Sequence, residues 1–304
     1  MRRISNSEIQ TWKECRRRWF LQYRRRLVLR RESPTGPAAI GTRVHTVIAS
    51  YYDGRINQEM RTHSASTTPL ALHDALVAAD LEAFPEFADQ IDKDASLTRA
   101  MVEGYLEWIE DTGADEGLEI VAPEQRLAYE ILPGVELQGK IDVRVRREHD
   151  GARMVLDHKT VDNFSQPTAL LPIDEQMKTY LLLERLCDPD ARTDGAIYNM
   201  LRKVKRTARA NPPFFERAEI RHNVHVMRDF YDRLIVELTD ILNAETEDPS
   251  AFYPSPTKNC SWKCPFFGVC PMMDDPTLDA EQYIEMFFEE GDPYARYETG
   301  EATA

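Results

Sequence analysis

Four cysteines placed at opposite ends of the chain constrain its fold more than any other feature. Cys15 lies near the N-terminus, and Cys260, Cys264 and Cys270 form a cluster about 245 residues later. Three cysteines in a short loop with a fourth far upstream could bind zinc or an iron–sulfur cluster. Because zinc modules usually take ligands in local pairs, this layout predicts a metal centre that closes the fold, whose loss loosens the whole domain.

The remaining composition indicates an ordinary globular protein. The 304 residues contain no apolar run of membrane-spanning length, and the arginine-rich N-terminus lacks the apolar stretch of a signal peptide. We therefore expect a cytoplasmic protein without membrane contact, in which cysteines are thiolates or metal ligands. The fifth cysteine, Cys187, ends an apolar run and is expected to be a small buried hydrophobic residue.

The charge is unevenly distributed along the chain. The net charge is −14, yet residues 13–31 contain nine basic residues, and the segment from Asp274 onward contains ten acidic residues and only one basic residue. A local basic surface can bind phosphate while the rest of a protein stays acidic. The alternative is a solvated helix face. The candidate phosphate-binding residues are Arg16, Arg17, Arg24, Arg25, Lys203 and Arg206.

The N-terminal half has helical periodicity. Ser5 or Ser7 is expected to cap a helix that extends to Tyr23 with one apolar face. The residues of that face are Ile9, Trp12, Cys15, Trp19 and Tyr23. A second helix is predicted to begin at Gly41, with an apolar stripe of Val44, Ile48 and Tyr51. Residues 60–112 predict further helices around a polar loop near 62–68.

The middle of the chain changes to strand periodicity. Short strands are predicted at 119–121 and 126–130, then a hairpin of 136–147 and 152–161 with its turn at Asp150-Gly151. A helix at about 172–187, a strand at 195–201, an edge strand at 217–221 and a long helix at 224–245 follow. This order predicts an α/β fold with a mixed sheet and a helical insertion.

Two acidic residues and a lysine are expected to meet on this hairpin. Asp142 projects away from the apolar face of its strand, and Asp157 and Lys159 share one face of the partner strand. Two carboxylates and water suit a magnesium or manganese ion. Phosphodiester hydrolysis needs such a Lewis acid, an activated water and a cation near the developing charge, and lysine supplies a compact charge. The alternative is an exposed sheet face with alternating charges.

These residues carry a resemblance to a known family. Asp142 followed by Asp157-His158-Lys159 resembles the PD-(D/E)XK nuclease superfamily. Gly41-Thr42-Arg43-Val44-His45 resembles the G-x-x-x-H element of its RecB-like branch, and Gln176-Met177-Lys178-Thr179-Tyr180 resembles that branch's Q-x-x-x-Y element. The two residues of the last element lie on one helix face, one turn apart. All four elements occur in the order typical of the branch.

The resemblance implies roles for these residues. His45, Asp142, Asp157 and the backbone carbonyl of His158 would hold Mg²⁺ or Mn²⁺, with the His158 imidazole pointing away. Lys159 would position water or stabilise the transition state. Gln176 and Tyr180 would support the strand or Lys159.

The cysteine layout also resembles the iron–sulfur exonucleases of the RecB-like and CRISPR-associated type. The resemblance implies that Cys15, Cys260, Cys264 and Cys270 hold a mainly structural 4Fe–4S cluster near the DNA path. Cys260 and Cys264 are separated by three residues where the family commonly has two, which leaves zinc or another cluster type open.

The resemblance implies a restriction-endonuclease-like core with a helical insertion and a C-terminal cysteine-rich segment. We expect one nuclease domain at 1–272, with the insertion at about 53–112, the catalytic core at about 119–245 and the cysteine cluster at 260–270 joined to Cys15. The segment 273–304 is expected to be an acidic tail, for which disorder is one interpretation.

The activity so implied is a metal-dependent DNA exonuclease that acts on single-stranded DNA or DNA ends. Trp12, Trp19 and Tyr23 could stack on bases, although core packing is the favoured interpretation. Two alternatives stay open at this point. One is a subunit active only with recombination, repair or CRISPR-adaptation proteins, and the other is a non-catalytic iron–sulfur DNA-binding module.

Overall fold

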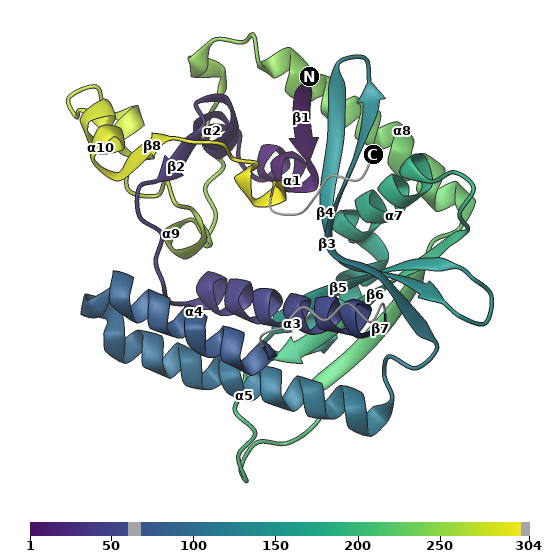
Figure 1. Cartoon of the computed structure of the whole chain (residues 1–304). Helices are drawn as coiled ribbons and strands as arrows, with labels where there is room; N and C mark the ends of the chain where they lie inside the picture. Colours follow the sequence, from purple (N-terminus) through teal and green to yellow (C-terminus); the bar gives the residue numbers. More distant parts are fainter. Residues whose placement is uncertain (60–67, 299–304) are drawn as a thin grey trace. The chain divides into compact units, whose positions relative to one another are not determined.

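The computed structural model describes residues 1–59 and 68–298 (Figure 1). Within them the chain divides into two compact units. The first unit comprises Met1–Glu32, Ala128–Gly139 and the chain from Val224, and the second comprises Ser33–Leu127 and Lys140–Asn223. Strands β3 (Leu118–Leu132) and β4 (Val135–Arg147) run from one unit into the other.

A mixed sheet forms the centre of the second unit. β4, β5 (Arg153–Val161), β6 (Thr193–Arg202) and β7 (Phe215–Arg221) are hydrogen-bonded in this order. β4 and β5 are antiparallel with Val143 opposite Leu156, β5 and β6 are parallel, and β7 is antiparallel to β6. The predicted hairpin, mixed sheet and edge strand are confirmed, with boundaries within about two residues.

Helices cover both faces of this sheet (Figure 1). α3 (Pro37–Glu59) and α5 (Ala88–Thr112) pack on one face, α4 (Pro69–Ala83) packs against both of them, and α7 (Glu175–Cys187) contacts β5 and β6. The core of the first face contains Val44, Val47, Ile48, Tyr52, Met101, Val102, Tyr105, Val143, Val145, Leu156 and Ile197. Because strand side chains alternate, burial of Val143 and Leu156 there turns Asp142 and Asp157 towards the α7 face.

Local sequence explains where these helices begin. α3 begins at Pro37, four residues before the predicted Gly41, because proline suits the first turn of a helix. In its stripe Tyr52 is fully buried, whereas Tyr51 is half-buried. α7 begins at Glu175, where the Asp174 carboxylate accepts a hydrogen bond from the Met177 amide at 2.8 Å.

The N-terminal helix of the first unit is interrupted, unlike the prediction. α1 (Asn6–Glu14) is capped by Ser5, and Cys15 then adopts an extended conformation with φ −162°. α2 (Arg16–Trp19) and a π-helical turn at Phe20–Arg24 follow. β1 (Arg2–Ser5), which was not predicted, pairs in parallel with β4 residues Val135 to Gln138.

The aromatic residues of this helical segment are core residues. Trp12, Trp19 and Tyr23 are all less than a tenth exposed, and Trp12 and Trp19 form an edge-on pair. Core packing, the favoured interpretation, is therefore confirmed over base stacking for these three side chains.

Two further expectations are wrong. The two short strands at 119–121 and 126–130 are one strand, β3, in which Glu124 has a positive φ of 49°. Cys187 is exposed, because it occupies the last position of α7, beyond the buried turns. The predicted polar loop at 62–68 lies almost wholly outside the described residues, and α4 and α5 confirm the helices predicted around it.

The acidic C-terminal segment is folded as far as residue 298. α8 (Val224–Ala244) and α9 (Cys260–Lys263) precede α10 (Ala280–Phe287) and β8 (Phe288–Glu290). β8 pairs with β2 (Leu27–Leu29), and Tyr294 and Tyr297 are buried. Burial of these side chains stabilises the segment despite its acidic composition. The expected disorder is therefore wrong for 273–298. Residues 299–304 lie outside the described residues.

The remaining elements are short. They are α6 (Ser165–Leu170) and the 3₁₀ turns Pro85–Phe87, Leu171–Ile173, Pro249–Ala251, Met272–Asp274 and Ala295–Tyr297. Among the described residues, none of the helices combines the length and apolarity needed to cross a bilayer.

Candidate active site

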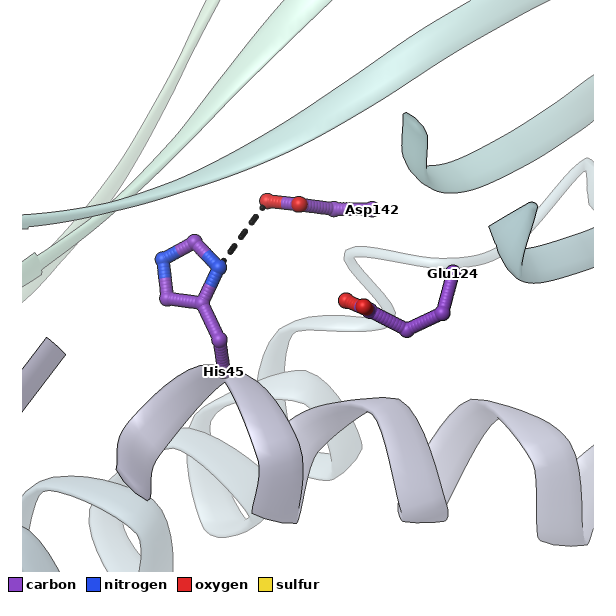
Figure 2. A group of neighbouring side chains, drawn as sticks. All are labelled: His45, Glu124 and Asp142. Carbon is purple, nitrogen blue, oxygen red and sulfur yellow. Dashed lines mark ion pairs between the residues drawn. The ribbon is translucent and has the colours of Figure 1, made fainter. Parts of the chain in front are cut away.

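His45, Glu124 and Asp142 converge in the second unit (Figure 2). His45 projects from α3, Glu124 from β3 and Asp142 from β4. One nitrogen or oxygen atom of each lies within 4.8 Å of the others. His45 Nδ1 is 3.2 Å from Asp142 Oδ2, and an imidazole with two carboxylates is a ligand set for a divalent metal ion.

Glu124 was not among the residues selected from the sequence. Its positive φ is uncommon for a residue with a side chain, and such conformations cluster at functional sites. Lys140 Nζ lies 2.5 Å from Glu124 Oε2. The only sequence signal for Glu124 is an acidic residue after Pro123 in a strand, which is too common to identify a ligand.

Asp157 and Lys159 form an ion pair on β5. Lys159 Nζ is 2.7 Å from Asp157 Oδ2 and donates a hydrogen bond to Gln176 Oε1 at 2.8 Å. The Gln176 amide group donates to Asp157 Oδ1 at 3.3 Å and to the Tyr180 hydroxyl at 2.9 Å. One helix face of α7 thus holds both members of the ion pair.

The His158 peptide group and side chain point in different directions. Its backbone N–H donates to Asp142 Oδ2 at 2.8 Å. Its imidazole is buried on the opposite face, with Nδ1 2.7 Å from the side-chain amide of Asn199 and the ring stacked on Tyr52. Burial lowers the pKa of His158 to about 3, so the ring is neutral. The imidazole therefore points away from the acidic cluster, as predicted.

Burial and neighbouring charges shift the pKa values of the carboxylates in this site. Burial raises the pKa of Asp157 to about 6; Lys159 opposes this shift and Asp142 adds to it. Burial and Asp142 also raise the pKa of Glu124. Burial acts in the same direction on Asp142, but His45 and His158 together outweigh it and hold the pKa of Asp142 below its usual range. A bound cation would stabilise the ionised form of such clustered, buried carboxylates and so favour the loss of their protons.

The chain matches the family model of the PD-(D/E)XK nuclease superfamily over residues 3–271. It belongs to this superfamily. A search of curated proteins gave no match. The mixed sheet flanked by helices fits the restriction-endonuclease-like α/β fold of PD-(D/E)XK nucleases. These enzymes hydrolyse the phosphodiester bonds of nucleic acids with divalent metal ions such as Mg²⁺ or Mn²⁺.

The four cysteines near the ends of the PD-(D/E)XK nuclease chain all belong to the first unit. The amide of Ser255 donates to Cys15 Sγ at 3.4 Å, and the amide of Thr257 donates to Cys260 Sγ at 3.3 Å. Cys264 accepts a backbone hydrogen bond from Phe266 and interacts electrostatically with Cys15 and Cys260.

Cys270 is held by the helix that follows Cys15. The Arg17 guanidinium contacts Cys270 Sγ at 3.7 Å and its carbonyl oxygen at 2.9 Å. Each of the four sulfurs therefore has an N–H donor, as metal-bound thiolates commonly do, while burial raises the pKa of the Cys264 thiol in the absence of a metal.

Most of the predicted phosphate-binding residues of the nuclease have partners within their own unit. Arg17 forms an ion pair with Asp274, and Arg25 forms one with Glu281; both carboxylates belong to the acidic C-terminal segment. Arg24 donates to the Glu247 carbonyl and Arg16 lies over the Trp12 ring. In the second unit, Lys203 pairs with Asp162 and Arg206 with Glu107.

Proposed function

We propose that this nuclease is a DNA exonuclease of the RecB-like, iron–sulfur type, acting on single-stranded DNA or DNA ends in the cytoplasm. The observation that carries the proposal is the convergence of His45, Glu124 and Asp142 next to the Asp157–Lys159 pair. The G-x-x-x-H and Q-x-x-x-Y elements supply His45, Gln176 and Tyr180 to this one site, which supports assignment to the RecB-like branch.

The residues present fit a divalent metal ion. In the proposed site His45, Asp142, Asp157 and the His158 carbonyl hold Mg²⁺ or Mn²⁺, and the structure adds Glu124 to this set. A bound ion would polarise a phosphoryl oxygen and lower the pKa of water. Three buried or half-buried carboxylates provide the negative charge that such an ion neutralises. The pKa values of Glu124 and Asp157 are raised, and the pKa of Asp142 is lowered.

The remaining side chains act on position and charge. Lys159 is held at one end of the site by Asp157 and Gln176, where its ammonium group can stabilise negative charge on the phosphoryl group. Tyr180 fixes the rotamer of Gln176 from the same helix face. The His158 N–H orients the Asp142 carboxylate.

The cysteine residues fit a 4Fe–4S cluster. All four are partly buried, and each sulfur accepts one N–H hydrogen bond. Ligation would join the N-terminal helix to the C-terminal segment, so that the cluster is part of the folding energy of the first unit. Metal and acid-labile sulfide analysis of anaerobically purified protein distinguishes this cluster from zinc.

Linear and circular single-stranded DNA test the exonuclease assignment. With Mn²⁺, wild-type protein should shorten end-labelled linear DNA from one end and leave circular DNA intact, and Asp157→Ala or EDTA should abolish the reaction. Cleavage of circular DNA at the same rate would contradict exonuclease action. Binding without cleavage in any divalent metal would favour a partner-dependent subunit or a DNA-binding module.

A further inference from the structure

Three large aromatic side chains beside the cysteines are exposed. Tyr253 and Trp262 are the most exposed, at 62% and 70%, and Phe267 is 49% exposed, whereas Phe252 and Phe266 of the same segment are buried. Phe252 stacks on Phe20 with ring centroids 4.9 Å apart, which anchors the backbone and directs Tyr253 outward. Exposed tryptophan and tyrosine carry a cost in hydrated apolar area and are enriched where a ligand covers them.

The rings of Tyr253 and Trp262 extend from chain segments fixed at residues 14–17. Next to Trp262, Lys263 Nζ forms an ion pair with Glu14 at 2.9 Å. The Tyr253 carbonyl accepts a hydrogen bond from the Arg17 amide at 3.2 Å. The two chain segments that carry the exposed rings therefore lie against neighbouring residues of the first unit, although eight residues separate the rings in the sequence.

Arg16 supplies positive charge in this region. Its guanidinium lies 3.2 Å from the Trp12 ring centroid, and its Nη1 atom is buried with no hydrogen-bond partner among the described residues. Burial lowers the pKa of Arg16, and electrostatic interactions with Tyr253, Asp240 and Glu247 oppose that shift. Arg17 and Arg25, by contrast, are neutralised by carboxylates.

We propose that Tyr253, Trp262 and Arg16 form a contact surface for single-stranded nucleic acid, with the rings stacked on unpaired bases and the guanidinium bound to a phosphate. The choice of ligand rests on the proposed function, which this surface extends by specifying a single strand. Aromatic platforms accept bases of any sequence but require them to be unstacked from a duplex. Exposed rings beside an arginine that forms no ion pair among the described residues suit unpaired bases and a phosphate, whereas two copies of this chain, each of net charge −14, would repel each other.

Binding measurements on full-length, anaerobically purified protein test the surface. Each protein carries Asp157→Asn so that cleavage does not interfere, and the probe is a fluorescent single-stranded oligonucleotide of mixed sequence or its duplex. Trp262→Ala and Tyr253→Ala should each weaken single-strand binding about 5-fold or more and leave duplex binding within about 2-fold. Arg16→Gln should reduce the slope of log K against log salt by about 0.7, the value for one phosphate of a single strand.

Matched variants and a second readout make the outcome decisive. Phe87→Ala, which removes a 41% exposed aromatic side chain from the second unit, and Arg228→Gln on α8 should bind like the parent. Single-stranded DNA should also quench tryptophan emission in the parent but not in Trp262→Ala, because Trp12 and Trp19 are buried and Trp108 is half-buried in the second unit. Wild-type-like binding by both aromatic variants, or equal loss on single strands and duplex, would overturn the surface.

The surface and the proposed activity can fail separately. If wild-type protein cleaves linear DNA but the aromatic variants bind like the parent, the surface is wrong and the exonuclease proposal stands. If Trp262→Ala loses single-strand binding while wild-type protein cleaves nothing, the surface stands and the exonuclease proposal is wrong.

Discussion

Lys159 Nζ donates a hydrogen bond to Gln176 Oε1 at 2.8 Å, while the amide group of the same glutamine donates to Asp157 and Tyr180. One side chain of α7 thus orients both the lysine and the carboxylate of β5. A planar amide with one acceptor and two donor hydrogens can satisfy all three partners at once. The arrangement makes Gln176 a positioning residue for the ion pair.

Removal of Gln176 should therefore slow the reaction more than it weakens substrate binding. We expect Gln176→Ala to lower kcat about 10- to 100-fold with KM changed by less than about 3-fold. Without the Gln176 hydrogen bond, Lys159 is no longer held where it can stabilise the negative charge that develops on the phosphoryl group. Steady-state cleavage of linear DNA measures both constants. Gln166→Ala, an exposed glutamine of α6, is the matched control. A change confined to KM would contradict the positioning role.

Glu124 is expected to contribute to metal binding. Glu124→Gln should raise the Mn²⁺ concentration needed for half-maximal thermal stabilisation about 10-fold, because one carboxylate is lost from the group with His45 and Asp142. Glu119→Gln changes a half-buried glutamate of the same strand, which forms an ion pair with Arg146, and should leave that concentration unchanged. Equal midpoints for the two variants would show that Glu124 is not a ligand.

The raised pKa of Asp157 predicts a pH-dependent stability in metal-free protein. Its folded-state pKa of about 6 exceeds the usual 3.8, so the folded protein keeps a proton that the unfolded chain releases between these values. The stabilising contribution is complete below pH 3.8 and is lost as the pH rises through about 6. Relative to Asp157→Asn, the free energy of unfolding of wild-type protein should fall by up to about 3 kcal/mol across this window.

Denaturant unfolding in EDTA from about pH 4 to 7 measures this difference. Asp162→Asn, beyond the end of β5 and exposed, should show no such trend relative to wild type. A difference between wild-type protein and Asp157→Asn that stays constant over the whole range would mean that the Asp157 carboxyl titrates normally.

The proposed cysteine ligands predict an effect on the stability of the protein that does not depend on catalysis. Cys264→Ser should remove bound iron and lower the midpoint of thermal unfolding by several degrees, since ligation contributes folding energy. Cys187→Ser, at the exposed end of α7, should retain full iron content and stability. Full iron content in Cys264→Ser, or equal loss in both variants, would contradict the assigned ligand set.

Much of the second unit could be predicted from the sequence because its signals are local. Period-two alternation placed Asp157 and Lys159 on one face of β5, and the i, i+4 spacing placed Gln176 and Tyr180 on one face of α7. The hairpin turn at Asp150-Gly151 fixed which strand lies beside Asp142. Each of these inferences needs only the geometry of one element and its neighbour.

Other features depend on contacts that local patterns do not contain. Glu124 reaches His45 through the tertiary placement of β3 against α3, which the alternation along β3 and its turn into β4 at 133–134 do not specify. The break at Cys15 interrupts a helix whose composition is helical throughout. The acidic C-terminal segment folds because β8 pairs with β2 and Tyr294 hydrogen-bonds to the buried Glu8, and charge density alone predicts the opposite.

The most direct test of the central claim is hydrolysis of linear single-stranded DNA by wild-type protein and by Asp142→Asn, in Mn²⁺ and in EDTA, with folding of both checked by circular dichroism. The account predicts Mn²⁺-dependent release of nucleotides by wild-type protein and at least about a 1,000-fold lower rate for the folded variant, because Asp142 joins His45 and the His158 amide at the metal site. Hydrolysis by Asp142→Asn at the wild-type rate would contradict it.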